Sequence, residues 1–218
     1  MIEIYLFVNP LGAICLGSEQ HLWNFVQTSE QKIQFRLMPL VNMQTIDAIL
    51  TRQGTAKHDI AARNQLFENT YSAALDAKAL QLQGKKKARE FLMHIQEAVA
   101  CKKQKYSQTL VISLVEAVGG DVEMFKEDRR SDLVKTLFQE DQNIAREMGI
   151  TTHPSAVVYN YACERDYGVL LEGAQALADI PRLCQIDQEN YQIFHIDGYL
   201  QRKNERRVTH DTKHLKLM

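Results

Sequence analysis

The sequence contains little that points to disulfide or metal chemistry. Only four of its 218 residues are cysteine, and they lie far apart: Cys15, Cys101, Cys163 and Cys184. No two of them have the spacing of a zinc site, and the seven histidines are scattered without forming a Cys/His cluster. We therefore expect free thiols, as in a reducing cytosol, and neither a structural metal nor a cofactor.

The chain also lacks long apolar runs and an excess of charge of either sign. No run approaches the roughly 20 apolar residues of a membrane helix. The opening stretch IEIYLFV carries Glu3 and follows no basic leader, which is not the pattern of a signal peptide. Lysine and arginine total 26 against 27 acidic residues, a formal charge of -1, so no overall field attracts nucleic acid or an anionic membrane. We expect a soluble cytoplasmic protein that binds neither.

The first 40 residues have the pattern of a β-α-β unit. Residues 2–8 form a short apolar run rich in β-branched and aromatic side chains, and Asn9-Pro10 ends it as a turn would. Apolar residues then recur at helical spacing over 22–26 and at alternate positions over 33–40. The pattern predicts a buried strand, a helix and a half-buried strand.

Residues 58–148 are predicted to form a block of helices. Asp121 is expected to cap a short helix, because its carboxylate can accept the unpaired backbone N–H groups of the first turn. Gly149 stands in the position after the last helix that favours a left-handed backbone. Apolar stripes at helical spacing run through residues 60–82, 88–99, 106–118 and 133–148.

Strand patterns return after this block. Residues 155–161 and 167–173 are separated by a short stretch that contains Cys163, Glu164, Arg165 and Asp166, which predicts a hairpin, and a helix is expected around 174–184. The sheet would then be mixed. Residues 185–218 form a C-terminal extension with one short apolar piece, YQIFHI, and a tail rich in lysine and arginine. We interpret that tail as solvated and not as a nucleic-acid site.

The order of these elements resembles the thioredoxin fold with the helical domain of the DsbA group. We therefore expect an α/β, thioredoxin-like fold with a large helical insertion. Residues 1–50 plus 150–184 would form the thioredoxin-like domain, 51–149 the helical insertion and 185–218 the C-terminal extension.

Thiol chemistry in that fold needs Cys-x-x-Cys at the first helix, where the helix dipole and free N–H groups lower the pKa of the first thiol. Here the four residues are Gly12-Ala13-Ile14-Cys15, so the exposed thiol is absent and the one at the resolving position remains. Cys15 could be a monothiol that forms mixed disulfides or senses oxidants. It could equally be a small buried hydrophobe in a packed turn, which is the interpretation we favour.

A second marker is the stretch TTHPS, in which Pro154 precedes a strand. In the thioredoxin fold such a proline is cis, faces the Cys-x-x-Cys turn and leaves the preceding backbone free to pair with an extended peptide. We predict a cis His153-Pro154 bond and a peptide-binding role for Thr152, His153 and Pro154. His153 could face Cys15 and act as its base, although a polar contact to the peptide is the role we favour.

Three longer stretches resemble the SpxH (YjbH) family: NPLGAICLGSE at the front, residues 72–99, and residues 120–160. Members of that family are cytosolic DsbA-like adapters that deliver the regulator Spx to the ClpXP protease. The resemblance carries over the motif positions Pro10, Gly12, Cys15 and Pro154. The chain departs from the family in Gly12, in lacking a His/Cys-rich leader, and in its C-terminal part.

Three functions follow, in order of preference. The first is an adapter whose partners are an Spx-like client and ClpXP, with a degenerate redox motif. The second is a DsbA-type thiol-disulfide oxidoreductase or isomerase that acts through Cys15 alone. The third is a glutathione-dependent transferase or isomerase.

Overall fold

The strands form one mixed sheet. A computed structural model describes residues 1–56, 59–162, 167–185 and 205–208. Within them the sheet has five strands in the order β2-β1-β3-β4-β5. The central strand β1 is parallel to β2 and antiparallel to β3, and β4 and β5 continue the sheet antiparallel. The strands are β1 (Ile2–Val8), β2 (Ile33–Pro39), β3 (Ser155–Asn160), β4 (Gly168–Glu172) and β5 (Glu205–Val208).

The predicted β-α-β opening and the β3-β4 hairpin are both confirmed. Strand β5 was not predicted, because a four-residue segment with three charged side chains lacks the apolar alternation of a half-buried strand. It pairs with β4, whose backbone would otherwise form an open edge. Part of the predicted C-terminal extension therefore belongs to the sheet, and its residues 186–204 and 209–218 lie outside the described part of the chain.

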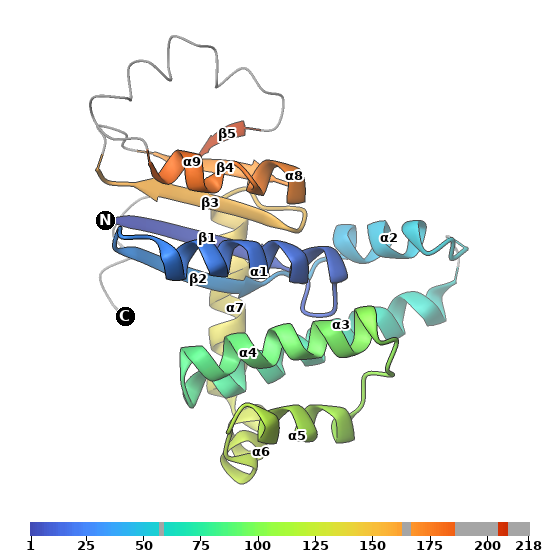
Figure 1. Ribbon diagram of the computed structural model, residues 1–218. Helices are drawn as coiled ribbons and strands as arrows, with labels where there is room; N and C mark the ends of the chain where they lie inside the picture. The colour runs from blue at the N-terminus through green and yellow to red at the C-terminus, as the bar shows by residue number, and fades with distance from the viewer. Residues whose placement is uncertain (57–58, 163–166, 186–204, 209–218) are drawn as a thin grey trace.

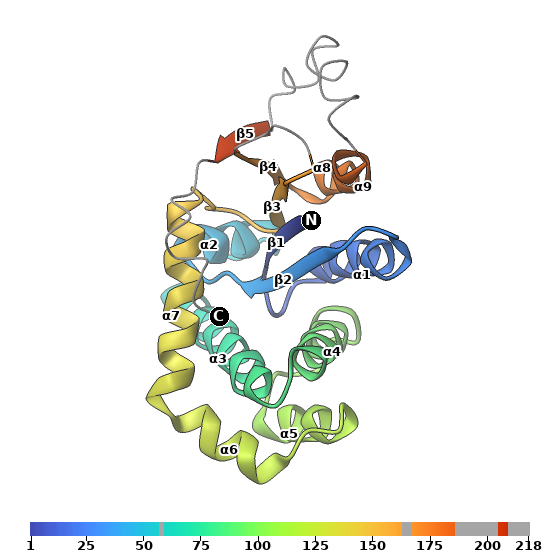
Figure 2. The same cartoon turned by 90° about the vertical axis from the view of Figure 1, so that its left-hand side faces the viewer.

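Helices cover both faces of the sheet (Figure 2). On one face lie α1 (Ala13–Thr28), α8 (Ala174–Leu177) and α9 (Ile180–Cys184), and on the other α7 (Asp132–Glu147) crosses β2. Side chains of β1 alternate between the two cores. Ile4 and Leu6 pack with the first set of helices, while Tyr5 and Phe7 pack with Ala145 and Met148 at the end of α7. Burial on both sides explains why β1 is an almost unbroken apolar run.

The helical block extends from one edge of the sheet (Figure 1). It contains α3 (Ile60–Leu82), α4 (Lys85–Gln96), the π-helical turn η1 (Glu97–Cys101), α5 (Gln108–Ala117) and α6 (Val122–Arg130), and α3 packs against α4, α6 and α7. The predicted cap is confirmed, since the Asp121 carboxylate accepts the Met124 N–H at 2.9 Å. Gly149 has the predicted positive φ, 69°. A buried ion pair between Lys78 and Asp141 joins α3 to α7.

One helix was missed by the sequence pattern. Helix α2 (Met43–Arg52) begins with a capping box, in which the Asn42 side chain accepts the Thr45 N–H and Thr45 bonds back to Asn42. Those two residues were the available signal. No helix in the described residues is both long and apolar enough to cross a membrane.

Candidate functional site at the start of helix α1

The sheet topology brings the predicted motif residues to one edge of the sheet, the edge formed by the carboxyl ends of β1 and β2. Strands β1 and β2 are parallel, so the turns that follow Val8 and Pro39 lie at the same edge and lead into α1 and α2. Strand β3 runs the other way, with Ser155 opposite Phe7, which places Pro154 beside the end of β1. In Figure 1 this edge lies on the right, where α1 and α2 begin. It is also the edge at which ligands bind in open α/β sheets.

Gly12 occupies the N-cap of α1. Its φ and ψ are -107° and 123°, a conformation open to any residue, so the backbone does not require glycine here. No side chain caps the helix at this position, although the Gly12 carbonyl accepts the Leu16 N–H at 3.1 Å. The place where a reactive thiol would lie is therefore present and carries no functional group.

Cys15 lies one turn further into α1 and is only 1% exposed. Its Sγ accepts the backbone N–H of Asn9 at 3.2 Å. Burial raises the pKa of Cys15 to about 12 and outweighs the Asn9 hydrogen bond, which acts in the opposite direction. At neutral pH this sulfur is a thiol and not a nucleophilic thiolate.

The structure brings His153 and Cys15 together, with Nδ1 3.5 Å from Sγ. The hydrogen bonds around the ring assign its tautomer. Asn9 Oδ1 accepts the Leu11 N–H at 2.7 Å, so the Asn9 amide turns its Nδ2 toward His153 Nε2, 3.4 Å away. Nε2 then accepts, and in the neutral ring the proton sits on Nδ1, facing Cys15.

His153 is neutral, because burial and then the positive charge of Arg52 lower its pKa to about 4. In this tautomer the imidazole donates a hydrogen bond to Cys15 and cannot take its proton at Nδ1. The contact is thus a polar packing interaction. To act as the base for Cys15, His153 would need an unprotonated Nδ1 that can accept the thiol proton.

Two further buried polar residues were not identified from the sequence. Gln96, at the end of α4, donates from Nε2 to the Asn9 carbonyl at 3.0 Å and to Glu19 Oε1 at 2.5 Å. Both side chains are fully buried, and burial raises the pKa of Glu19 to about 8. Their positions could have indicated that they are buried, because Glu19 lies one helical turn after Cys15 and Gln96 lies one turn after Leu92 on the apolar stripe. Through Gln96, the helical insertion therefore binds both the turn, at the Asn9 carbonyl, and helix α1, at Glu19.

The loop before β3 contains Thr152, His153 and Pro154, for which the sequence predicted a peptide-binding role. The His153-Pro154 bond is cis, as predicted. The Thr152 carbonyl accepts the Ser155 hydroxyl at 2.9 Å, and the Asn42 side chain holds the Thr151 carbonyl at 3.2 Å. Within the described chain, the backbone N–H of Thr152 has no hydrogen-bond partner.

Two large apolar side chains are exposed at this edge. Ile14, in the first turn of α1, is 51% exposed, and Met43, in the first turn of α2, is 45% exposed. We use the name turn surface for Leu11, Ile14, Met43 and the Thr152-His153 backbone. An apolar surface beside an unpaired N–H suits an extended peptide segment of a partner protein.

The other thiols take no part in this site. Cys184 is buried and Cys101 is exposed, and both are free, whereas Cys163 lies outside the described residues. No three metal-ligating side chains come together anywhere in the described chain.

Comparison with known proteins agrees with this architecture. A family model described as thioredoxin matches residues 5–181. The chain belongs to the thioredoxin family. Solved structures of similar shape include a putative protein disulfide isomerase from Nitrosomonas europaea, with a TM-score of 0.60, 16% identity and coverage of 93% of this chain and 99% of that one. DsbA from Pseudomonas aeruginosa has a TM-score of 0.57 at 12% identity, with coverage of 92% and 86%. The predicted DsbA-like thioredoxin fold is confirmed.

The resemblance to SpxH is also confirmed. Proteins named ClpXP adapter protein SpxH are 30% identical over 172 residues in Staphylococcus saprophyticus and 26% identical over 189 residues in Bacillus subtilis. Each match covers 79% of this chain but only 60% and 63% of those relatives. This thioredoxin-family chain therefore spans about three-fifths of the length of the adapters it resembles.

Proposed function

We propose that this protein is a cytoplasmic adapter that binds an Spx-like regulator and promotes its degradation by ClpXP. The observation that carries the proposal is the state of the turn. Gly12 leaves no first thiol, and Cys15 is buried and protonated, so dithiol exchange has no reactive group. The turn surface beside it nevertheless keeps exposed Ile14 and Met43 and a free backbone donor. A site that binds protein without thiol chemistry is what an adapter requires.

The names of the relatives supply the protease, since the sequence-similar proteins are ClpXP adapters. The client is what the resemblance to the SpxH family implies. We place client binding in the thioredoxin-like part of the chain, where the turn surface lies. Extended segments add to such a fold through main-chain hydrogen bonds, and exposed side chains beside the groove add apolar contact. We assign client binding to the turn surface on that basis.

The test is the rate of Spx degradation by purified ClpXP, with and without this protein. We expect acceleration by the wild type and by Cys15→Ala, because the thiol takes no part. The double variant Ile14→Asp/Met43→Asp should bind the client at least about tenfold more weakly, since it replaces two large exposed apolar contacts by charges. Leu133→Asp is the matched control, because Leu133 is 54% exposed on α7 and does not belong to the turn surface.

Each arm can contradict a separate part of the proposal. No acceleration by the wild type would remove Spx as the client. Equal activity of the double variant and Leu133→Asp would remove the turn surface as the binding site. Loss of acceleration in Cys15→Ala would instead favour the second candidate.

That second candidate is a monothiol activity of Cys15, favoured by its contact with His153. It would proceed by attack of the Cys15 thiolate on a disulfide of the substrate, which would form a mixed disulfide and release the other substrate sulfur as a thiolate. The raised pKa of Cys15 and the tautomer of His153 both oppose this chemistry. Trapping of a mixed disulfide that is absent in Cys15→Ala would support it.

A further inference from the structure

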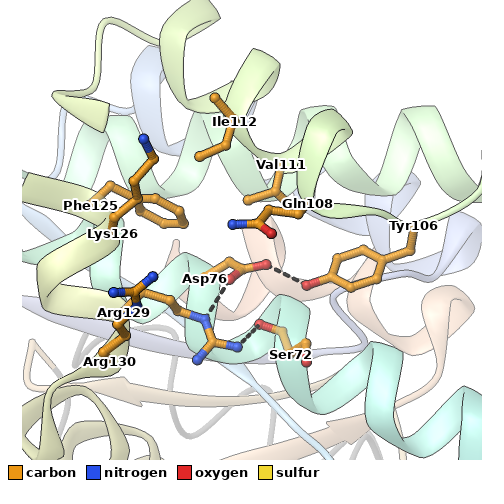
Figure 3. A pocket seen from close by; sticks show the side chains of 10 residues that line it. All are labelled: Ser72, Asp76, Tyr106, Gln108, Val111, Ile112, Phe125, Lys126, Arg129 and Arg130. Carbon is orange, nitrogen blue, oxygen red and sulfur yellow. Dashed lines mark hydrogen bonds and ion pairs between the residues drawn. The ribbon is translucent and has the colours of Figure 1, made fainter. Parts of the chain in front are cut away.

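A second candidate binding site lies inside the helical insertion. A cavity of about 270 Å³ opens between α3, α5 and α6 (Figure 3). None of its lining residues belongs to the turn surface or to the Cys15 network. Pockets for drug-sized ligands are typically larger, about 300–1,000 Å³. The volume therefore suits a ligand about the size of one amino-acid residue.

One wall of this cavity is apolar. Val111 and Ile112 come from α5 and Phe125 from α6, and Val111 and Phe125 also contribute to the main core. Val111 and Phe125 are almost fully buried in that core, and Ile112 is partly buried against it. An apolar group would cover the small apolar surface that this wall still exposes, whereas an inorganic anion would leave it in contact with water.

The opposite wall is polar and already ordered. The buried carboxylate of Asp76 accepts the Tyr106 hydroxyl at 2.5 Å and Nε of Arg129 at 2.6 Å, as the dashed lines in Figure 3 show. A second guanidinium nitrogen of Arg129 donates to the Ser72 carbonyl at 3.4 Å. Asp76 thus uses both its oxygens on protein groups, and its charge offsets that of Arg129.

The net charge of the lining is positive. Lys126 is paired with Glu123 at 2.6 Å, and Arg129 with Asp76. Arg130 is exposed at the rim and has no ion-pair partner among the described residues. One uncompensated positive charge therefore lies beside an apolar wall and a pre-positioned guanidinium. A planar carboxylate matches guanidinium geometry and carries the single negative charge that this lining lacks.

We infer that the cavity binds an apolar monocarboxylate. The apolar group would lie against Val111, Ile112 and Phe125, and the carboxylate would meet Arg130 and the free edge of Arg129. Such a group occurs both as a free aromatic or aliphatic acid and as the C-terminal residue of a peptide that ends in an apolar side chain. The site does not depend on the adapter function, so either proposal can fail without the other.

The test is a titration of the full-length, isotope-labelled protein followed by amide chemical shifts. The probes are 3-phenylpropionate with its neutral amide, and the peptide Ala-Ala-Phe with its C-terminally amidated form. The acids should shift resonances of α5 and α6 and should bind about tenfold more tightly than the amides, because a charge-assisted hydrogen bond is lost in the amide. The two pairs distinguish a free acid from a peptide terminus.

Arg130→Gln should weaken binding of the acid by a similar factor. Arg146→Gln is the control, because Arg146 is also exposed near a helix end and the change in charge is the same, but it lies on α7 outside the cavity. Thermal unfolding of both variants verifies that they fold. Equal affinity for acid and amide, unchanged affinity in Arg130→Gln, or shifts confined to the turn surface would each overturn the inference, as would no shift with any acid.

Discussion

The reactivity of Cys15 gives the most direct test of the site, because its burial predicts a large effect. The folded environment raises the pKa of this thiol from 9.0 to about 12. Three pKa units correspond to a thousandfold smaller thiolate fraction at any pH below 9. The side chain is also 1% exposed, so a reagent must wait for local opening. We expect alkylation of Cys15 at pH 7.5 to be at least about a thousandfold slower than that of an exposed thiol.

The chain carries its own references for this measurement. Cys101 is exposed, and Cys184 is buried with its pKa raised by burial to about 12. Iodoacetamide is added to the native protein, the reaction is quenched at intervals, and modification of each cysteine is read from its peptide by mass spectrometry. Cys15 and Cys184 should lag far behind Cys101, and the differences should disappear in guanidinium chloride. Labelling of Cys15 within tenfold of the Cys101 rate would refute the assignment of a buried, protonated thiol.

Three further predictions concern the same framework. The folded structure raises the pKa of Glu19 from 4.5 to about 8. The free energy of unfolding should therefore fall by up to about 5 kcal/mol as the pH rises through that window. Urea unfolding at pH 5 and pH 8 measures this dependence, which Glu19→Gln should remove. A wild-type curve that is flat between those pH values would show that Glu19 ionises normally. Gly12→Cys should allow a disulfide with Cys15 after the turn shifts by a few tenths of an ångström, because a Cβ there lies 3.1 Å from Asn9 Cβ; a persistent dithiol mass under oxidising conditions would contradict this. Lys78→Met should cost roughly 3 kcal/mol in urea unfolding by leaving Asp141 buried without its partner, and adding Asp141→Leu should recover most of that loss, whereas no recovery would exclude the ion-pair explanation.

Much of the fold could be predicted because its signals are local. The apolar run of β1, the helical spacing in α1 and the cap at Asp121 each depend on residues within a few positions of one another. The cis bond before Pro154 was predicted from the resemblance to the thioredoxin fold and not from local pattern. Helix α2 was missed although its capping box is local, since its apolar residues form only a short stripe. Strand β5 was missed because its pairing is decided by the open edge of β4.

The sequence by itself determined that the turn has Gly12 in place of a first thiol, and hence that no disulfide can form within it. Only the tertiary structure decided the state of the thiol that remains. Asn9 and His153 both contact the sulfur of Cys15, and Gln96 binds the Asn9 carbonyl, although these three residues are separated from one another by tens of positions in the chain. The pKa of a side chain depends on solvent exclusion and on dipoles within a few ångströms, and periodicity along a chain does not specify which distant segments provide them. The same reason applies to the cavity between α3, α5 and α6, whose two walls come from helices that meet only in the folded protein.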